Sequence, residues 1–410
     1  MPRRPLAALR PLLLTAALLA TGAVAAQPVT DDPRVGLRAG WQDAEQASYN
    51  LELVAHVPKP EGFFNPTDPG DFSMMNSDLA FRGDVLFLGS FEGLQVWSIA
   101  DPAHPVLRAT LPCPGGQGDV SVLGNLLFMS VEETRGRVDC GPQGVAEPVS
   151  ADRFRGVRVY DIADVTSPRQ VAAVQTCRGS HTHTLVPDAN DASHVFIYVS
   201  GTSGVRPGEE LAGCSSATPV EDPDSTSYFR IEVIEVSLAH PEAAHIVNAP
   251  RIFADAATGN PAGLWNGGNH GEGTQQSAQT NSCHDITVYP EIGLAAGACA
   301  GNGILLDISD PANPRRLAQH QVRDAQSEAE FDPHALLWWP ATGLLVVPMT
   351  DGALALRVGA DGLTPAGRIT QPDPIRRSLV IGGDLWTLSD TGLQASELST
   401  LDRVAWVPFA

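Results

Sequence analysis

The sequence predicts an all-β protein, a β-propeller of about six four-stranded blades, with seven blades as the alternative count. Three observations predict this fold. One strand–turn–strand phrase recurs along the chain, a short hairpin precedes several copies of it, and 39 glycines and 33 prolines are spread between the apolar segments. Units of four antiparallel strands that repeat along a chain are typical of propeller blades. A long β-sandwich is a weaker alternative because sandwiches do not repeat a four-strand unit.

The chain begins with the features of a secretory signal peptide. Three arginines precede an apolar run that ends in small residues around positions 23–26, as in exported proteins. The predicted organisation is a signal peptide at 1–26, an N-terminal extension at 27–50 and a single propeller domain at 51–410. No later stretch reaches the roughly 18 to 20 apolar residues that a membrane helix needs. We therefore expect a secreted or periplasmic protein without a transmembrane segment.

The charge balance is strongly negative. The chain has 26 Lys and Arg residues against 47 Asp and Glu residues, a formal net charge of -21. Such a surface is a poor partner for nucleic acid and for anionic membranes. The acidic residues are spread along the chain, which is typical of a solubilising surface, and we expect a monomer.

The repeated phrase consists of an apolar strand, a polar turn rich in Asp and Pro, and a second strand. Clear copies begin at Leu94 (LQVWSIADPAHPVLRA), Val157 (VRVYDIADVTSPRQVAA) and Ile304 (ILLDISDPANPRRLAQ), and weaker copies begin at Ile231, Leu354 and Leu393. Several copies are preceded by a segment such as NSDLAFRGDVLFLGSF at 76–91. Its apolar alternation bounded by Gly, Asn and Asp predicts a strand–turn–strand hairpin. The segment LELVAHVPKP at 51–60 resembles a lone outer strand, which we expect to complete the last blade or to be the remnant of a seventh.

The turn phrases IADPAHP and DISDPANP, with the apolar strands before them, resemble the LVIVD repeat family of secreted bacterial propellers. The resemblance covers roughly residue 51 to the end of the chain and is strongest between Asn76 and Leu317. After Phe331 the phrases become degenerate. The resemblance implies a propeller and an exported location, but it implies no catalytic reaction.

Six cysteines in an exported chain predict disulfides. Cys283 and Cys299 are equidistant from the predicted turn at Glu291, which places them opposite each other on the first two strands of the fourth blade. The other pairs flank the first hairpins of the second and third blades, so the predicted disulfides are Cys113–Cys140, Cys177–Cys214 and Cys283–Cys299. We expect these three bridges to lie at the same place in three successive blades.

One position recurs just before the apolar alternation of each predicted first strand. It is occupied, in chain order, by Ser77, Gly118, His183, His284, His334 and Arg377. The first strand of a propeller blade lines the central channel. We therefore expect His183, His284 and His334 at one level of the channel mouth, with Ser77, Asp78, Asp119 and Arg377 on its rim.

Two interpretations of these histidines stay open. Three imidazoles with Asp285, Asp119 or Asp78 nearby are a ligand set that one divalent zinc, copper or iron ion accepts, which would suit a metal-dependent hydrolase or oxidase. Alternatively, the histidines are struts that hydrogen-bond to backbone groups at the blade edges. The sequence identifies no catalytic residue.

Further candidates lie in or near predicted insertions. His181 is two residues before His183, and in a strand this spacing places both on one face. The Gly- and Asn-rich segment 264–276 could place His270 on the channel rim, and insertions follow Val131 and Arg206. Nucleophile-elbow, phosphate-loop and dinucleotide motifs do not occur in a strand-to-helix context. The favoured hypothesis is an exported binding or scaffold protein that engages a protein, peptide or glycan through one elaborated loop face.

Overall fold

The computed structural model describes residues 32–40, 43–68, 70–217, 226–228, 230–254, 268–269, 276–277, 280, 282–299, 302–320, 322, 327–330, 332–359 and 362–409. The chain divides into two compact units, Met1–Val54 and Ala55–Ala410. The described residues of the first unit form neither helix nor strand. The predicted signal peptide at 1–26 lies outside the described residues.

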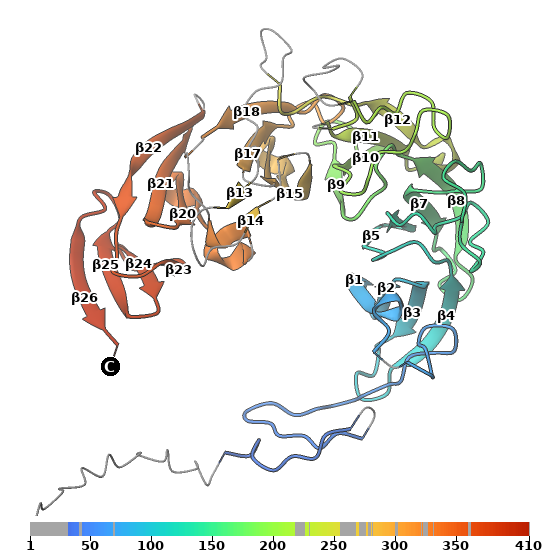
Figure 1. Ribbon diagram of the computed structural model, residues 1–410, viewed down its shortest axis with the longest axis horizontal. Coiled ribbons are helices and arrows are strands. Elements are labelled where there is room, and N and C mark those ends of the chain that lie inside the picture. Colours follow the sequence, from blue (N-terminus) through green and yellow to red (C-terminus); the bar gives the residue numbers. More distant parts are fainter. Residues whose placement is uncertain are drawn as a thin grey trace, which may run out of the picture. The chain divides into compact units, whose positions relative to one another are not determined.

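The second unit contains six four-stranded antiparallel sheets, and in each sheet the strands hydrogen-bond in chain order (Figure 1). The first sheet consists of β1 (Asn76–Arg82), β2 (Val85–Ser90), β3 (Gly93–Ser98) and β4 (Val106–Pro112). The second consists of β5 (Val120–Leu123), β6 (Leu126–Val131), β7 (Gly156–Asp161) and β8 (Arg169–Gln175). The third consists of β9 (His183–Pro187), β10 (His194–Val199), β11 (Glu232–Ser237) and β12 (His245–Asn248).

The remaining sheets follow the same order. The fourth consists of β15 (Cys283–Tyr289), β16 (Leu294–Cys299), β17 (Asn302–Asp307) and β18 (Arg315–Gln319). The fifth consists of β19 (Leu337–Trp339), β20 (Leu344–Met349), β21 (Gly352–Gly359) and β22 (Gly362–Ile369), and the sixth of β23 (Ile375–Ile381), β24 (Asp384–Ser389), β25 (Gly392–Glu397) and β26 (Arg403–Pro408). A two-stranded hairpin, β13 (Gly268–Asn269) and β14 (Gln276–Ser277), precedes the fourth sheet. This architecture confirms the all-β class and the six predicted repeats.

The described helices are short 3-10 turns. They are η1 (Phe72–Met74), η2 (Pro241–Ala243), η3 (Pro290–Ile292), η4 (Glu328–Glu330), η5 (Pro333–Ala335) and η6 (Pro340–Thr342). Proline opens several of them because the first residues of a helix do not need their N–H group. Within the described residues, no helix has the length and apolar character needed to cross a membrane.

The recurring turn phrase has a physical basis in its Asp side chains. After β3, Asp101 Oδ1 accepts the backbone N–H of Ala103 at 3.0 Å, and after β17, Asp310 Oδ1 accepts that of Ala312 at 3.1 Å. An Asp that bonds to the backbone two residues later fixes a tight turn. The phrase therefore marks the connection between the third and fourth strands of a sheet, which explains why it recurs once per repeat.

Apolar layers join neighbouring sheets. Phe87 of β2 and Leu127 of β6 are fully buried in the layer between the first and second sheets. Equivalent layers join the second to the third, the third to the fourth and the fifth to the sixth sheet, and the fourth and fifth sheets contact through β18 and β22. Burial of such side chains contributes roughly 1.5 to 3 kcal/mol each.

The segment 51–60 departs from its prediction. It forms no strand, and several of its apolar side chains are exposed. Pro58 and Pro60 lack the backbone N–H that a sheet ladder requires. The alternating pattern of this segment therefore indicated a strand that the structure does not contain.

The structure contains the three predicted disulfides. Cys283 and Cys299 are register partners on β15 and β16, as predicted. The expectation that all three bridges share one location is wrong. Cys113 and Cys177 follow the outer strands β4 and β8, whereas Cys140 and Cys214 lie in insertions. Each of these two bridges therefore ties an inserted loop to the end of the preceding sheet. The prediction failed because Cys140 and Cys214 lie in the insertions and not on strands.

The second and third sheets each have a long insertion between their second and third strands. Loop A comprises residues 132–155, between β6 and β7, and loop B comprises residues 200–231, between β10 and β11. Residues 218–225 and 229 of loop B lie outside the described residues. Because second strands end where first strands begin in an antiparallel sheet, both loops adjoin the edge that carries the predicted channel residues.

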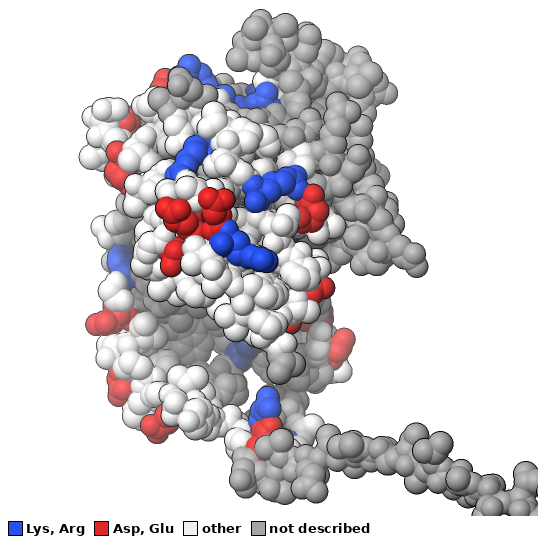
Figure 2. Space-filling model, turned by 90° about the vertical axis from the view of Figure 1, so that its left-hand side faces the viewer, with Lys and Arg blue, Asp and Glu red and all other residues white. Residues whose placement is uncertain are grey.

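Charges are mixed on the face seen in Figure 2. Acidic and basic side chains lie there among uncharged ones. Ion pairs of the fifth and sixth sheets include Arg368–Asp351 at 2.5 Å and Arg376–Asp390 at 3.1 Å. On the face in Figure 2, basic side chains lie beside the acidic ones.

Candidate functional site

The starts of the first strands form an edge at which neighbouring sheets hydrogen-bond to each other. Asp78 Oδ2 of β1 accepts a backbone N–H of β5 at 3.0 Å, and Asp119 Oδ2, just before β5, accepts the N–H of His183 in β9 at 2.9 Å. Thr184 Oγ1 of β9 donates to a backbone carbonyl of β15 at 2.6 Å. We call this region of the first four sheets the inner edge. Its carboxylates and hydroxyls link sheets that share no backbone ladder.

Two backbone irregularities correct the predicted alignment of this edge. The β15–β16 register shifts between Cys283 and Asp285, which places His284 on a β-bulge. In β23 the equivalent shift lies between Ile375 and Arg377, so Arg376 rather than Arg377 matches His284. A bulge adds one residue to a strand. Because both strands have their bulge at the same place, Arg377 corresponds to Asp285, and the predicted alignment of Arg377 with His284 is off by one position.

The His183 side chain is held by two other side chains. Its side chain is fully buried, and its Nδ1 lies 2.7 Å from Asp119 Oδ2 and 2.9 Å from Ser130 Oγ. Its Nε2 is buried and has no hydrogen-bond partner. A Ser–His–Asp relay needs the serine and the carboxylate on opposite ring nitrogens. Ser130, His183 and Asp119 therefore do not form such a relay.

His181 and His284 meet from different sheets. Their ring centroids are 4.7 Å apart in an edge-to-face arrangement. His181 Nδ1 lies 2.7 Å from Glu132 Oε1 of loop A, and His284 Nδ1 lies 2.8 Å from Asp285 Oδ2. The His284 side chain is 61 % exposed, whereas that of His181 is 20 % exposed. Each imidazole is thus oriented by one carboxylate at the same ring nitrogen.

The carboxylates of the inner edge differ in their proton affinity. The hydrogen bond from His284 holds the pKa of Asp285 below its ordinary value, and the same bond raises the pKa of His284. Burial raises the pKa of Asp78, and the adjoining Asp119 carboxylate adds to this rise. Burial also acts to raise the pKa of Asp119, but the charge and hydrogen bonds of His183 outweigh it and lower that pKa. The Asp119 carboxyl therefore loses its proton at lower pH than the Asp78 carboxyl.

The other predicted site residues lie elsewhere or outside the described residues. Ser77 Oγ donates to the carbonyl of Gln117 across the first two sheets. His334 lies on η5 rather than on a strand, is exposed, and shares Asp332 with Arg377. His270 is outside the described residues. In the ranges that the structure describes, no three His, Cys, Asp or Glu side chains are placed to hold one metal ion.

Sequence reasoning missed Glu132. This residue directly follows β6 and opens loop A, and besides His181 it lies 3.4 Å from Thr202 Oγ1 of loop B. Its only signal in the sequence is its place at the start of the insertion after Val131. The pairing with His181 needs the third dimension, since the two residues belong to neighbouring sheets.

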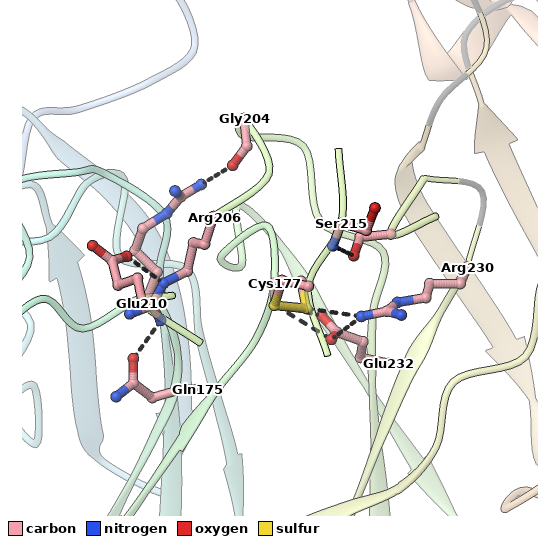
Figure 3. Close-up of a disulfide and its surroundings, with 11 residues drawn as sticks. Gln175, Cys177, Gly204, Arg206, Glu210, Ser215, Arg230 and Glu232 are labelled. Carbon is pink, nitrogen blue, oxygen red and sulfur yellow. Dashed lines mark hydrogen bonds and ion pairs between the residues drawn. A yellow bond between two sulfur atoms is a disulfide. The ribbon is translucent and has the colours of Figure 1, made fainter. Parts of the chain in front are cut away.

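Loops A and B share a buried ion network (Figure 3). Arg206 of loop B is 2 % exposed, and its Nε lies 2.7 Å from Glu210 Oε1. The other oxygen of Glu210 binds Arg153 of loop A and accepts the N–H of Ser150 at 3.0 Å. The Glu210 side chain is only 1 % exposed. One carboxylate thus joins two guanidinium groups from two loops.

The Cys177–Cys214 disulfide lies beside this network (Figure 3). Cys177 N donates to Glu232 Oε2 at 3.1 Å, and Arg230 Nη2 lies 3.1 Å from Glu232 Oε1. The N–H of Arg206 donates to the carbonyl of Cys177 at 2.9 Å. The disulfide and the ion network therefore hold loop B between Arg206 and Cys214, and the Arg230–Glu232 pair holds the end of the loop beside Cys177.

Arg155 connects the loops to the inner edge. Its Nε donates to the carbonyl of Glu132 at 3.0 Å, and its Nη2 donates to the carbonyl of Gly204 at 2.7 Å. Burial, together with the charge of Arg206, lowers the pKa of Arg155 to about 10. Arg155 stays protonated at neutral pH and fixes the position of the residue that orients His181.

Two surface grooves adjoin the second sheet. One of about 370 Å³ runs beside the Cys113–Cys140 disulfide and is lined by Val138, Tyr160 and Gln170, among others. A larger one of about 720 Å³ lies at the opposite edge, where it is lined by Leu123 and Pro241, among others. Only the smaller groove includes loop A.

Comparison with known proteins agrees with the architecture. A family model described as a beta propeller domain matches residues 302–401. No curated protein matches the chain. The six four-stranded sheets and this match define the chain as a β-propeller protein.

The solved structures that match this chain share little sequence with it. A protein from Lactobacillus plantarum is 13% identical over 81% of this chain and 84% of its own, with a TM-score of 0.43. Citrobacter koseri AztD is 10% identical over 82% and 72%, with a TM-score of 0.40. Chaetomium thermophilum Sqt1, solved bound to the N-terminus of ribosomal protein L10, is 11% identical over 82% and 88%, with a TM-score of 0.37.

Proposed function

We propose that this protein is an exported binding scaffold of the LVIVD type, and that loops A and B form the surface that engages a protein, peptide or glycan. One observation carries the proposal. Both loops are insertions, yet they are held in place by two disulfides and by the buried Arg153–Glu210–Arg206 network. Loops on a rigid scaffold are where propellers and other β folds place recognition.

Preorganisation is the physical reason. Ordering a loop during binding costs conformational entropy, and a loop that is ordered beforehand avoids this cost. The disulfides are typical of proteins that fold in an oxidising compartment, which supports export. The smaller groove beside loop A offers an apolar contact, because Val138 lines it and is 49% exposed.

The test begins with immobilised full chain and the exported fraction of the native host. A captured partner is then purified, and its affinity is measured for the native chain and for Val138→Glu. We expect the substitution to weaken binding at least about tenfold, because it places a charge in an apolar contact.

The matched control is Val404→Glu, which places the same charge on an exposed valine of β26. It should leave the affinity unchanged. Two outcomes contradict the proposed loop surface. Either Val138→Glu and Val404→Glu lower the affinity equally, or neither Val138→Glu nor Val149→Glu, a second variant of loop A, lowers it. Circular dichroism and thermal melting confirm that each variant is folded.

A further inference from the structure

We propose that His181 and His284 bind one divalent transition-metal ion through their Nε2 atoms, with Glu132 and Asp285 as the carboxylates that orient them. The proposal concerns the inner edge and is independent of the loop surface. It replaces the predicted trio of His183, His284 and His334 with a pair of imidazoles that the structure places in contact.

In both rings Nδ1 faces a carboxylate, which leaves Nε2 as the nitrogen that can bind a metal ion. An imidazole whose Nδ1–H donates to a carboxylate presents the lone pair of Nε2. Both His181 and His284 have this arrangement, with Nδ1 to carboxylate distances of 2.7 and 2.8 Å. A carboxylate behind a histidine is the recurring outer shell of protein metal sites because it fixes the tautomer and raises ligand basicity.

Position and access support the same conclusion. His284 lies on the bulge of β15, and its backbone carbonyl accepts a hydrogen bond from Thr182 Oγ1, next to His181 in the chain. These features hold both ligands near each other although they come from different sheets. The exposed His284 side chain gives an ion access from solvent.

The local charge favours a cation. Glu132 and Asp285 flank the two rings, and Asp119 is close enough to influence Asp285 electrostatically. The cation Arg155 contacts Glu132 at its backbone carbonyl rather than at its carboxylate. Zinc and copper accept neutral imidazoles readily.

Two imidazoles leave coordination positions for water or for a donor from a bound partner. His183 is not a ligand in this proposal, because its side chain is fully buried and its Nδ1 is shared between Asp119 and Ser130. We therefore expect an affinity in the micromolar range, weaker than that of a closed four-ligand site.

The experiment is isothermal titration calorimetry of the metal-free full chain with zinc chloride, with the Co²⁺ absorption spectrum as a second readout. We expect one zinc per chain, and an affinity at least about tenfold lower in His181→Ala and in His284→Ala. Asp285→Asn and Glu132→Gln keep the imidazoles but change their orientation. We expect each to lower the affinity by about 10- to 100-fold.

His194→Ala is the matched control, because His194 also has a carboxylate 2.9 Å from its Nδ1 but lies at the start of β10. It should bind zinc like the native chain. His284→Gln, which retains a polar side chain, serves if the alanine variant unfolds. Absence of saturable zinc binding, or binding that persists in a His181→Ala and His284→Ala double variant, overturns the proposal. Partner binding measured with a chelator present distinguishes this failure from failure of the loop surface.

Discussion

Glu210 stabilises two buried guanidinium groups, those of Arg153 and Arg206. Glu210→Gln would leave both cations without a charged partner, and breaking a buried ion pair costs about 3 to 5 kcal/mol of unfolding free energy. Urea denaturation measures this loss. Glu209→Gln, at the exposed neighbouring position, should change the free energy by less than about 0.5 kcal/mol. Similar values for the two variants would show that the network does not hold the loops.

His284 provides a test of pH dependence. Its pKa is raised by the hydrogen bond to Asp285, so its stabilising contribution is fully present below the ordinary histidine value of about 6.5 and is lost as pH rises through the folded value. NMR titration of the imidazole should give a pKa above about 6.5 in the native chain. It should give a lower one in Asp285→Asn. An unchanged value in that variant would contradict the pairing.

At the residue scale, sequence reasoning found His181, His183 and His284. It also named Asp119 and Asp285, the carboxylates beside His183 and His284, but it missed Glu132, the partner of His181. The apolar alternation of each first strand marks where the strand begins, and these positions lie at or just before that start. The bulge at His284 and the Glu132–His181 contact leave no such mark. They depend on register and on the packing of one sheet against another, which a single strand does not encode.

At the scale of elements, Gly89 in β2 shows how closely the first two sheets approach. A Cβ atom at Gly89 would lie 2.0 Å from the carbonyl oxygen of Gly118. Gly89→Ala should therefore lower stability by about 1 to 3 kcal/mol, because backbone must move to accept the methyl group. Thermal melting measures the effect. Gly383→Ala, where nothing lies within 4 Å, is the control, and equal melting temperatures would contradict the close approach.

The disulfide of loop B has a different role from that of β15 and β16. Replacing Cys177 and Cys214 with serine should cost about 2 to 4 kcal/mol and should speed amide hydrogen exchange in residues 200–217. Replacing Cys283 and Cys299 should leave exchange in loop B unchanged, because that bridge joins two strands of one sheet. Unchanged exchange after the first replacement would contradict the anchoring of loop B.

The repeated elements were predictable because each repeat contains its own turn chemistry. The Asp side chains that close the third-to-fourth-strand turns stand in the sequence as IADP and ISDP. The segment 51–60 has the same apolar alternation without such a turn, and it forms no strand. Alternation alone therefore predicts strands less well than alternation followed by a bonded turn.

At the scale of the molecule, six repeats form the sheets, and two long insertions make the second and third sheets different from the others. The sequence predicts the repeats, the three cysteine pairs and the presence of insertions. It does not predict that Arg153, Glu210 and Arg206 meet, since these residues lie in the insertions of two different sheets. Function on such a fold depends on its site rather than on the repeats.

The most direct test of the loop surface is hydrogen–deuterium exchange of the full chain, alone and with its purified partner. We expect binding to slow exchange in loop A, residues 132–155, and in residues 200–217 of loop B. Slower exchange confined to the groove lined by Leu123 and Pro241 at the opposite edge, with loops A and B unchanged, would contradict this expectation.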